Sequence, residues 1–336
     1  MNSDEQFYNK PFSHIYIEND TFEYPITKKI IGRFDSATII PINHYKDVFN
    51  RSKQNYVRQS RSQSLILAKQ NEAHIYEGAP VCQNFGNEYF YYTSCVMNCI
   101  YDCEYCYLKG MYPSGNMVLF VNLEDTFEEI KAKLKEHPMY LCVSYDTDLL
   151  AIESLTGYVE KWIDFVEEND NLTIEIRTKS ANTEVWNTLK KSDRVIYAFT
   201  LSPEKIVTEY EHKTPSLKAR LESIKMAQQK GHIIRLCFDP MIYTPDWKTH
   251  YLDMLDCVRS SVDMDELWDV SVGSFRVSQD YLKKMRRNMP HSAVVQFPYQ
   301  NTDGVYHYPY NLLEDMEGFM NEKLSQIISK DKIFRW

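Results

Sequence analysis

Short runs of β-branched and aromatic residues alternate with longer amphipathic runs through the middle of this chain. The apolar runs predict strands over residues 139–145, 172–178, 195–201, 233–238 and 269–275. The amphipathic runs predict helices over residues 152–168, 184–190, 216–230, 248–258 and 279–287. Such alternation indicates an α/β fold with parallel strands and right-handed crossovers. Either an open doubly wound sheet or a full or partial (β/α) barrel satisfies it, and both place reactive groups at the carboxyl ends of the strands.

Three regions are expected from these patterns. Residues 1–85 are a smaller N-terminal region with short strands near residues 15–17 and 37–42, and residues 86–290 are the α/β body. Residues 291–336 hold a tyrosine-rich loop and a terminal helix. The chain lacks both G-x-G-x-x-G and the P-loop motif, which argues against a nucleotide-phosphate site of either kind.

The composition indicates a globular protein and excludes several other classes. The 336 residues carry a net charge of -9 and are 43% hydrophobic, as in globular proteins whose core needs no disulfides. No uncharged apolar run reaches about 18 residues and the first ten residues are polar, so we expect a cytoplasmic protein without a membrane span or signal peptide. The acidic balance argues against bulk attraction to a polyanion. Residues 51–69 nevertheless contain cations and no acid, which fits either a solvated face or a phosphate contact.

Four of the eight cysteines, Cys95, Cys99, Cys103 and Cys106, fall within twelve residues. In a reducing compartment, clustered cysteines are more often metal ligands or catalytic groups than disulfides. A structural zinc site normally uses two paired knuckles separated by a longer loop, which this spacing does not provide. The C-x₃-C-x₂-C of the last three instead suits a [4Fe–4S] cube with one iron left open.

With Tyr105 directly before Cys106, the motif Cys99, Cys103, Cys106 resembles the signature of the radical SAM superfamily. The resemblance implies a partial (β/α) barrel whose cluster loop follows a first strand at residues 90–93. It also implies that the open iron binds S-adenosylmethionine (SAM). An electron from a reductant such as flavodoxin or ferredoxin then splits SAM into methionine and a 5′-deoxyadenosyl radical.

A closer resemblance is to the spore photoproduct lyase family. It rests on segments in the same order along most of residues 12–265: residues 15–18, 23–25, 103–108, 121–124, 176–179, 199–202, 240–243 and Trp247. The resemblance implies a monomeric lyase that repairs a thymine dimer in DNA. The radical abstracts hydrogen from the dimer, a carbon–carbon bond is cleaved, and a hydrogen atom is returned.

Site residues follow from that resemblance one by one. Tyr105 and Tyr107 match tyrosines near SAM and the hydrogen-return path, and Lys179 matches a lysine that contacts the SAM carboxylate or the substrate. Thr200 and Ser202 stand where the family has a serine and an asparagine, and hydroxyls there can orient the ribose. The alternatives are an exposed strand end for Lys179 and ordinary strand positions for Thr200 and Ser202.

The chain departs from the family at the hydrogen donor, where Tyr145 replaces a cysteine. A phenol O–H can yield a stable radical, so Tyr145 is expected to donate hydrogen, alone or with Tyr107, or else to pack or stack on substrate. Cys142 lies three positions earlier on the same predicted strand, and an odd separation should turn it to the opposite face. Four other cysteines are expected to be core thiols: Cys82, Cys95, Cys237 and Cys257.

A second departure lies in residues 301–310, where the family carries a basic hairpin for DNA and this chain has no Arg or Lys. Cations of residues 51–69 and 283–287 are expected to compensate, with tyrosines stacking on an extruded base. Other substrates remain open, namely another modified nucleobase, a peptide or a metabolite. The alternative that is not an enzyme is a zinc or redox-sensing nucleic-acid-binding protein.

Overall fold

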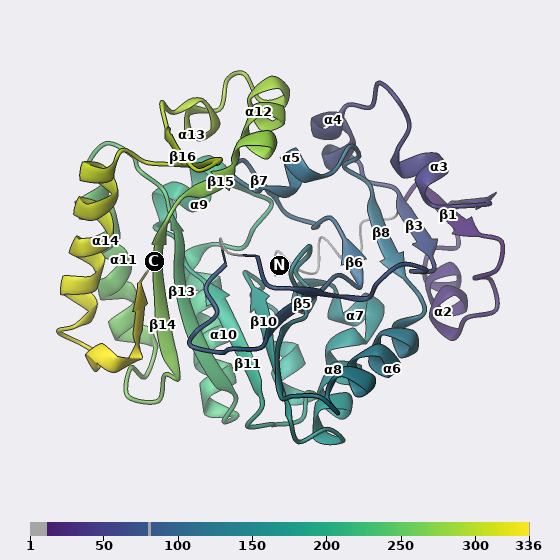
Figure 1. Cartoon of the computed structure of the whole chain (residues 1–336), viewed down its shortest axis with the longest axis horizontal. Helices are drawn as coiled ribbons and strands as arrows, with labels where there is room; N and C mark the ends of the chain where they lie inside the picture. Colours follow the sequence, from purple (N-terminus) through teal and green to yellow (C-terminus); the bar gives the residue numbers. More distant parts are fainter. Residues whose placement is uncertain (1–11, 80–81, 336) are drawn as a thin grey trace.

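An eight-stranded sheet forms the centre of the computed structural model, which describes residues 12–79 and 82–335 (Figure 1). Its strands, from edge to edge, are β18 (Ile333–Arg335), β14 (Asp269–Ser274), β13 (Ile233–Met241), β11 (Val195–Thr200), β10 (Leu172–Thr178), β9 (Met139–Cys142), β5 (Phe90–Thr93) and β4 (Ile75–Glu77). All neighbours pair in parallel except β4 with β5. Since β4 and β18 are open edges, the sheet is a partial (β/α) barrel, as predicted.

Several of the helices that follow strands of this sheet pack against it. The larger helices of the chain are α6 (Leu123–Lys133), α8 (Tyr158–Glu167), α10 (Leu217–Gln229), α11 (Trp247–Ser261), α12 (Gln279–Asn288) and α14 (Tyr310–Leu324). The shorter ones are α2 (Pro25–Arg33), α3 (Lys46–Phe49), α4 (Tyr56–Arg61), α5 (Leu108–Met111), α7 (Glu153–Thr156), α9 (Glu204–Tyr210) and α13 (Ala293–Gln296), with 3₁₀ turns at Leu150–Ile152, Glu184–Asn187 and Lys330–Lys332. Within the described ranges, no helix has the length and apolar character needed to cross a bilayer.

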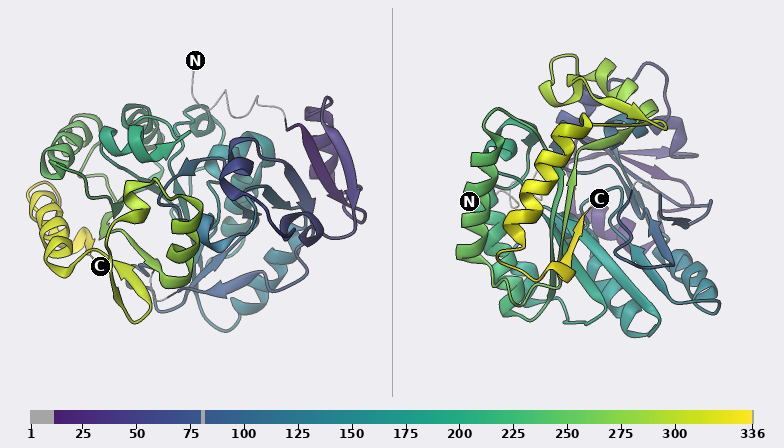
Figure 2. Two further views of the ribbon diagram at one scale, coloured as in Figure 1. Left: turned by 90° about the horizontal axis from the view of Figure 1, so that it is seen from above. Right: turned by 60° about the vertical axis from the view of Figure 1, so that its left-hand side comes forward.

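A second, five-stranded sheet packs beside the barrel, and its first strands are the purple arrows in Figure 2. Its order is β2 (Thr38–Ile42), β1 (His14–Glu18), β3 (Leu65–Ala68), β8 (Met117–Phe120) and β6 (Val96–Met97). Strand β8 comes after the cysteine cluster in sequence but pairs with β3 of the N-terminal region. The cluster loop connects β6 to β8, which pair antiparallel, and therefore begins and ends at this second sheet. Strand β4, before the expected domain boundary at residues 85 and 86, pairs with β5 after it. The boundary itself stays a prediction.

Three expected elements are clearly shorter in the structure. The helix predicted over residues 184–190 is only a 3₁₀ turn at Glu184–Asn187. The helix predicted over residues 152–168 is interrupted at Gly157, whose φ of 68° lies in the left-handed region that favours glycine. The strand predicted over residues 139–145 ends at Cys142. Beyond it, the Asp148 carboxylate accepts hydrogen bonds from Thr178 Oγ1 at 2.7 Å and from the Lys179 backbone N–H at 2.6 Å. These side-chain contacts hold residues 143–148 as a loop at the end of the sheet.

Close packing of α12 against α5 fixes the cysteine loop from outside. At Gly110 in α5, a Cβ would lie 2.4 Å from the backbone oxygen of Tyr281 in α12, so only glycine allows this approach. Asn288 Nδ2 also donates to the Lys109 backbone oxygen at 3.4 Å. On the other side, Tyr56 of α4 donates to Asn98 Oδ1 at 2.9 Å. The residues flanking Cys99–Cys106 are therefore clamped between α4 and α12.

A buried charge network lies in the middle of the barrel sheet. Arg235 of β13 pairs with Asp269 of β14, at 2.6 Å between NH2 and Oδ2, and with Glu175 of β10. All three side chains are at most 5% exposed. Removing one partner of such a network leaves uncompensated buried charge.

Arg235→Met is therefore expected to lower the free energy of unfolding by about 3–5 kcal/mol. Urea denaturation followed by circular dichroism measures this. The matched control is Arg259→Met, because Arg259 is 58% exposed and its pair with Asp256 at 4.0 Å is worth at most about 1 kcal/mol. Equal losses in the two variants would contradict the assignment of a stabilising role to the network.

Candidate active site

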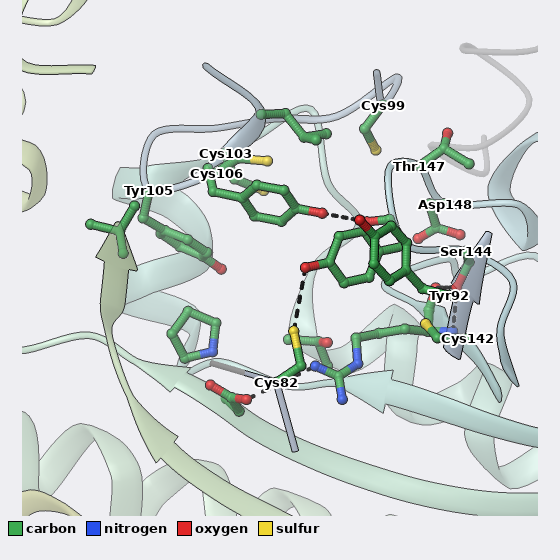
Figure 3. A pocket seen from close by; sticks show the side chains of 18 of the residues that line it. Cys82, Tyr92, Cys99, Cys103, Tyr105, Cys106, Cys142, Ser144, Thr147 and Asp148 are labelled. Carbon is green, nitrogen blue, oxygen red and sulfur yellow. Dashed lines mark hydrogen bonds and ion pairs between the residues drawn. The ribbon is translucent and has the colours of Figure 1, made fainter. Parts of the chain in front are cut away.

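A cavity of about 520 Å³ lies between the cysteine loop and the carboxyl ends of the barrel strands (Figure 3). Its wall includes residues from five barrel strands: Tyr92, Cys142, Thr178, Thr200 and Asp239. This is the end of the sheet at which the α/β alternation predicted reactive groups. The opposite wall is the segment from Cys99 to Met111.

The three motif cysteines, Cys99, Cys103 and Cys106, all line this cavity. Cys103 lies on β7 (Asp102–Cys103), and Cys106 lies just before α5. Burial raises the pKa of all three thiols, to about 11 for Cys103, where Lys179 opposes the effect of burial. Without a metal these groups stay protonated, so binding one must release protons. Cys95 is buried in the hydrophobic core and does not line the cavity, as expected.

Lys179, just beyond the end of β10, reaches across the cavity to the cysteine loop. Its Nζ donates to Tyr105 Oη at 2.7 Å and lies 3.5 Å from Cys103 Sγ. Nζ also lies 3.1 Å from Oε1 of Glu211, a carboxylate that the sequence patterns did not single out. Thus three of the expected site residues meet at one point, and Lys179 is not a solvent-exposed strand end.

Thr200 and Ser202 differ in position. Thr200 ends β11 and lines the cavity, whereas Ser202 is 1% exposed, is not part of the cavity wall, and donates to Glu211 Oε1 at 2.8 Å. A role for Thr200 toward a ligand remains a prediction. Ser202 instead contacts Glu211, the carboxylate that also accepts a hydrogen bond from Lys179.

Tyr145 lines the cavity from the loop after β9, and its ring stacks on Tyr92 with centroids 4.1 Å apart. Tyr107 Oη donates to the Tyr145 backbone oxygen at 2.7 Å, and the two rings are 5.8 Å apart. The expectation that Cys142 faces away from Tyr145 is wrong. Because the strand ends at Cys142, strand alternation does not extend to Tyr145, and both side chains line the same cavity.

Two of the cysteines expected to be core thiols were misassigned, because Cys257 is exposed at the surface and Cys82 lines the cavity. Cys82 is only partly buried and has its Sγ 3.3 Å from Tyr145 Oη (Figure 3). Burial raises the pKa of both groups, so each keeps its hydrogen at neutral pH. Tyr145 stands where the family resemblance implies a cysteine. Cys82, from a distant segment of the chain, therefore brings a thiol into contact with this tyrosine.

A family model described as "Spore photoproduct lyase" matches residues 11–295. The chain belongs to the spore photoproduct lyase family. Similar curated proteins are the spore photoproduct lyases of Clostridium acetobutylicum, 21% identical over 84% of each chain, and of Bacillus subtilis, 19% identical over 76% of this chain and 75% of that protein. Membership makes this chain a radical SAM enzyme of the lyase type, which uses a [4Fe–4S] cluster and SAM.

Solved spore photoproduct lyases share the fold. One, complexed with dinucleoside spore photoproduct, superposes with a TM-score of 0.81 at 16% identity, covering 97% of this chain and 99% of that chain. A mutant with bound AdoMet and dinucleoside spore photoproduct gives a TM-score of 0.81 at 17% identity, with the same coverage. The partial barrel of this chain is therefore the barrel of the spore photoproduct lyase family.

The thiols fit the family's cluster better than a single ion. Within the two described ranges, no three His, Cys, Asp or Glu side chains are grouped so as to hold one metal ion. A mononuclear site needs that convergence, whereas a cube offers each thiolate a different iron. Cys99, Cys103 and Cys106 would hold the cluster, with Lys179 and Tyr105 beside it.

The basic residues gather near the cysteine loop rather than on the hairpin. Exposed cations on α4 and α12, the helices that clamp this loop, are Arg58, Arg61, Lys283, Lys284 and Arg287. The hairpin of β16 (Gln300–Thr302) and β17 (Val305–His307) turns through Asp303 and Gly304 and carries no cation. It pairs with β15 (Arg276–Ser278), whose Arg276 lines the cavity.

Proposed function

We propose that this enzyme repairs spore photoproduct in DNA by cleaving the carbon–carbon bond that joins the two thymines. The observation that carries the proposal beyond family membership is the contact of Cys82 with Tyr145, in the cavity that the three motif cysteines line. Repair requires a hydrogen atom to be returned to the product. A thiol and a phenol in contact beside the cluster position are suited to that step.

When bound, the cluster and SAM supply a 5′-deoxyadenosyl radical that abstracts a hydrogen atom from the lesion. The chain's own residues hold the reactants in place. Lys179 lies against Cys103 and Tyr105 and would face SAM, with Thr200 on the adjoining strand. Lys179 offers a charge-assisted hydrogen bond to a carboxylate.

Hydrogen return follows from the chemistry of the lesion, which is an isomer of the two thymines released. Each hydrogen atom removed must therefore be matched by one returned. Cys82 Sγ–H gives a hydrogen atom, proton and electron together, to the carbon radical left on the product. Tyr145 Oη–H then restores the thiol across their 3.3 Å contact. Tyr145 regains its hydrogen, with Tyr107 nearby, from 5′-deoxyadenosine, which carries the atom first removed.

Aromatic side chains form the part of the cavity wall suited to thymine bases. Tyr92, Tyr145 and Tyr281 line the cavity with Phe90 and Phe275. Stacking of a base on such a ring contributes about 1–3 kcal/mol. The lesion is expected to enter extruded from the helix, as in enzymes that act on single bases.

Nucleic-acid binding is expected to rely on α4 and α12. Their exposed cations can contact phosphates, while the net charge of -9 and the hairpin without Arg or Lys limit attraction over a longer duplex. Binding is therefore expected to be weak and strongly salt-dependent. A reductant such as flavodoxin or ferredoxin supplies the electron, and the enzyme acts as a monomer.

The test is conversion of dinucleoside spore photoproduct by anaerobically reconstituted, dithionite-reduced enzyme with SAM. Chromatography is expected to show the thymine dinucleotide together with SAM-derived products. Production of 5′-deoxyadenosine with the lesion left intact would contradict the proposed substrate. Protein that contains zinc and no iron or sulfide would contradict the proposed chemistry altogether.

A further inference from the structure

A buried carboxylate joins the cysteine loop to the barrel. Glu211 lies on β12 (Glu211–His212), which pairs antiparallel with β7, and Glu211 is the direct register partner of Cys103. The Glu104 backbone N–H also donates to the Tyr210 backbone oxygen at 2.8 Å. The Glu211 side chain is fully buried. A cluster cysteine and this carboxylate are therefore fixed to each other through the backbone.

Four side chains converge on the Glu211 carboxylate. Oε1 accepts hydrogen bonds from Ser202 Oγ at 2.8 Å, from Lys179 Nζ at 3.1 Å and from Tyr105 Oη. Oε2 accepts from Arg220 NH2. Burial by itself would raise the pKa of Glu211, but Arg220 and Lys179 outweigh it and hold the pKa low. The buried Glu211 carboxylate is therefore paired with two cations, Arg220 and Lys179.

Arg220 extends the network away from the cavity. Its guanidinium is fully buried and donates to the backbone oxygens of Pro215 at 3.0 Å and Thr200 at 3.2 Å. It thus ties Glu211 to the end of β11. The carboxylate is held on one side by Arg220 and presents its other oxygen to Lys179 and Tyr105.

We propose that Glu211 is a positioning residue for SAM, holding Lys179 and Tyr105 in the orientation that receives the cofactor. This inference rests on the proposed use of SAM. The charges support it, because two cations and one carboxylate leave one net positive charge to meet the carboxylate of the methionine group. Without Glu211, Lys179 and Arg220 would repel each other, and Tyr105 would lose its acceptor.

Glu211→Gln keeps the shape of the side chain and removes its charge. It is expected to weaken SAM binding at least about tenfold, a loss in the range of one charge-assisted hydrogen bond. Equilibrium dialysis of SAM against reconstituted protein measures the affinity, and iron and sulfide content is determined on the same samples. SAM binding changes the electron paramagnetic resonance spectrum of the reduced cluster. In Glu211→Gln, this change is expected to require a higher concentration of SAM.

Two further variants separate a positioning role of Glu211 from a role in keeping the protein and its cluster intact. Glu153→Gln alters another buried carboxylate, which lies at the start of α7 outside the cavity wall, and is expected to leave SAM affinity unchanged. Glu211→Asp retains the charge and is expected to bind SAM better than Glu211→Gln. Unchanged affinity in Glu211→Gln, or losses in both Glu211 variants that only follow lost iron, would overturn the inference. If the unaltered enzyme fails to bind SAM, the proposed function itself fails.

Discussion

Cys82→Ala is expected to reduce conversion of spore photoproduct by about 10²-fold or more, at least as much as a positioned proton-transfer group contributes to catalysis. SAM cleavage should continue, because Cys82 is not a cluster ligand of the motif. The carbon radical left after bond cleavage would lack its hydrogen source and give side products. Liquid chromatography with mass spectrometry of thymine products and 5′-deoxyadenosine measures both quantities in one reaction.

Matched cysteine variants identify which thiol acts. Cys142→Ala changes the other non-motif thiol that lines the cavity, and Cys257→Ala changes an exposed one. Both are expected to retain repair. Tyr145→Phe keeps the stacked ring and removes only the hydroxyl that contacts Cys82, so repeated turnovers should slow while the first remains. A repair-deficient Cys142→Ala beside an active Cys82→Ala would refute the assignment of the donor.

Cys103→Ala is expected to abolish the cluster and, with it, SAM cleavage. Cys103 is buried on β7, where it pairs with β12 and has Lys179 Nζ at 3.5 Å. A cluster left with two of its three thiolates is not expected to survive purification. Iron and sulfide analysis, the brown absorbance and 5′-deoxyadenosine formation should fall together to background.

Cys95→Ala is the control for that result. Cys95 lies in the same run of sequence, but it is buried in the core with its Sγ 3.9 Å from the Val143 backbone oxygen. Its replacement should leave iron content and SAM cleavage near those of the unaltered enzyme. Iron retained in Cys103→Ala, or lost in Cys95→Ala, would contradict the ligand set.

Local sequence patterns were sufficient for the elements that carry their own periodicity. The run that became β11 is continuous because all its residues are buried, and a strand buried on both faces needs no alternation. The run that became β10 instead alternates Leu172, Ile174 and Ile176 with polar residues, which is the period of a strand. The motif Cys99, Cys103, Cys106 is similarly local, since all its ligands come from one loop. These features allowed the α/β alternation and the cluster motif to be predicted, whereas the choice of a partial barrel came from the resemblance to the radical SAM superfamily.

Features that depend on long-range contacts could not be predicted in this way. Cys82 lies between β4 and β5 in the sequence and meets Tyr145 only because β5 and β9 are neighbours in the sheet. The predicted orientation of Cys142 was wrong because hydrogen bonds to Asp148 end the strand early. Glu211 follows α9 with no local motif, and only its pairing with Cys103 reveals its role.

The five-stranded sheet was missed for the same reason. Strands β3 and β8 are each four residues long, and no helical pattern between them marks a crossover. They are adjacent because the chain leaves the N-terminal region, enters the barrel at β5, and returns to the second sheet with β6 and, after the cysteine loop, with β8. A short buried strand has too little sequence to distinguish it from other apolar segments.

The most direct measurement uses perdeuterated dinucleoside spore photoproduct with the reduced, reconstituted enzyme and unlabelled SAM. Mass spectrometry is expected to find two repaired thymines, and deuterium at the 5′ carbon of the adenosyl group in 5′-deoxyadenosine or recovered SAM. The same reaction with Cys82→Ala should still transfer deuterium but yield little repaired product. An unlabelled adenosyl group beside an intact lesion, under conditions in which SAM is cleaved, would contradict the proposed function.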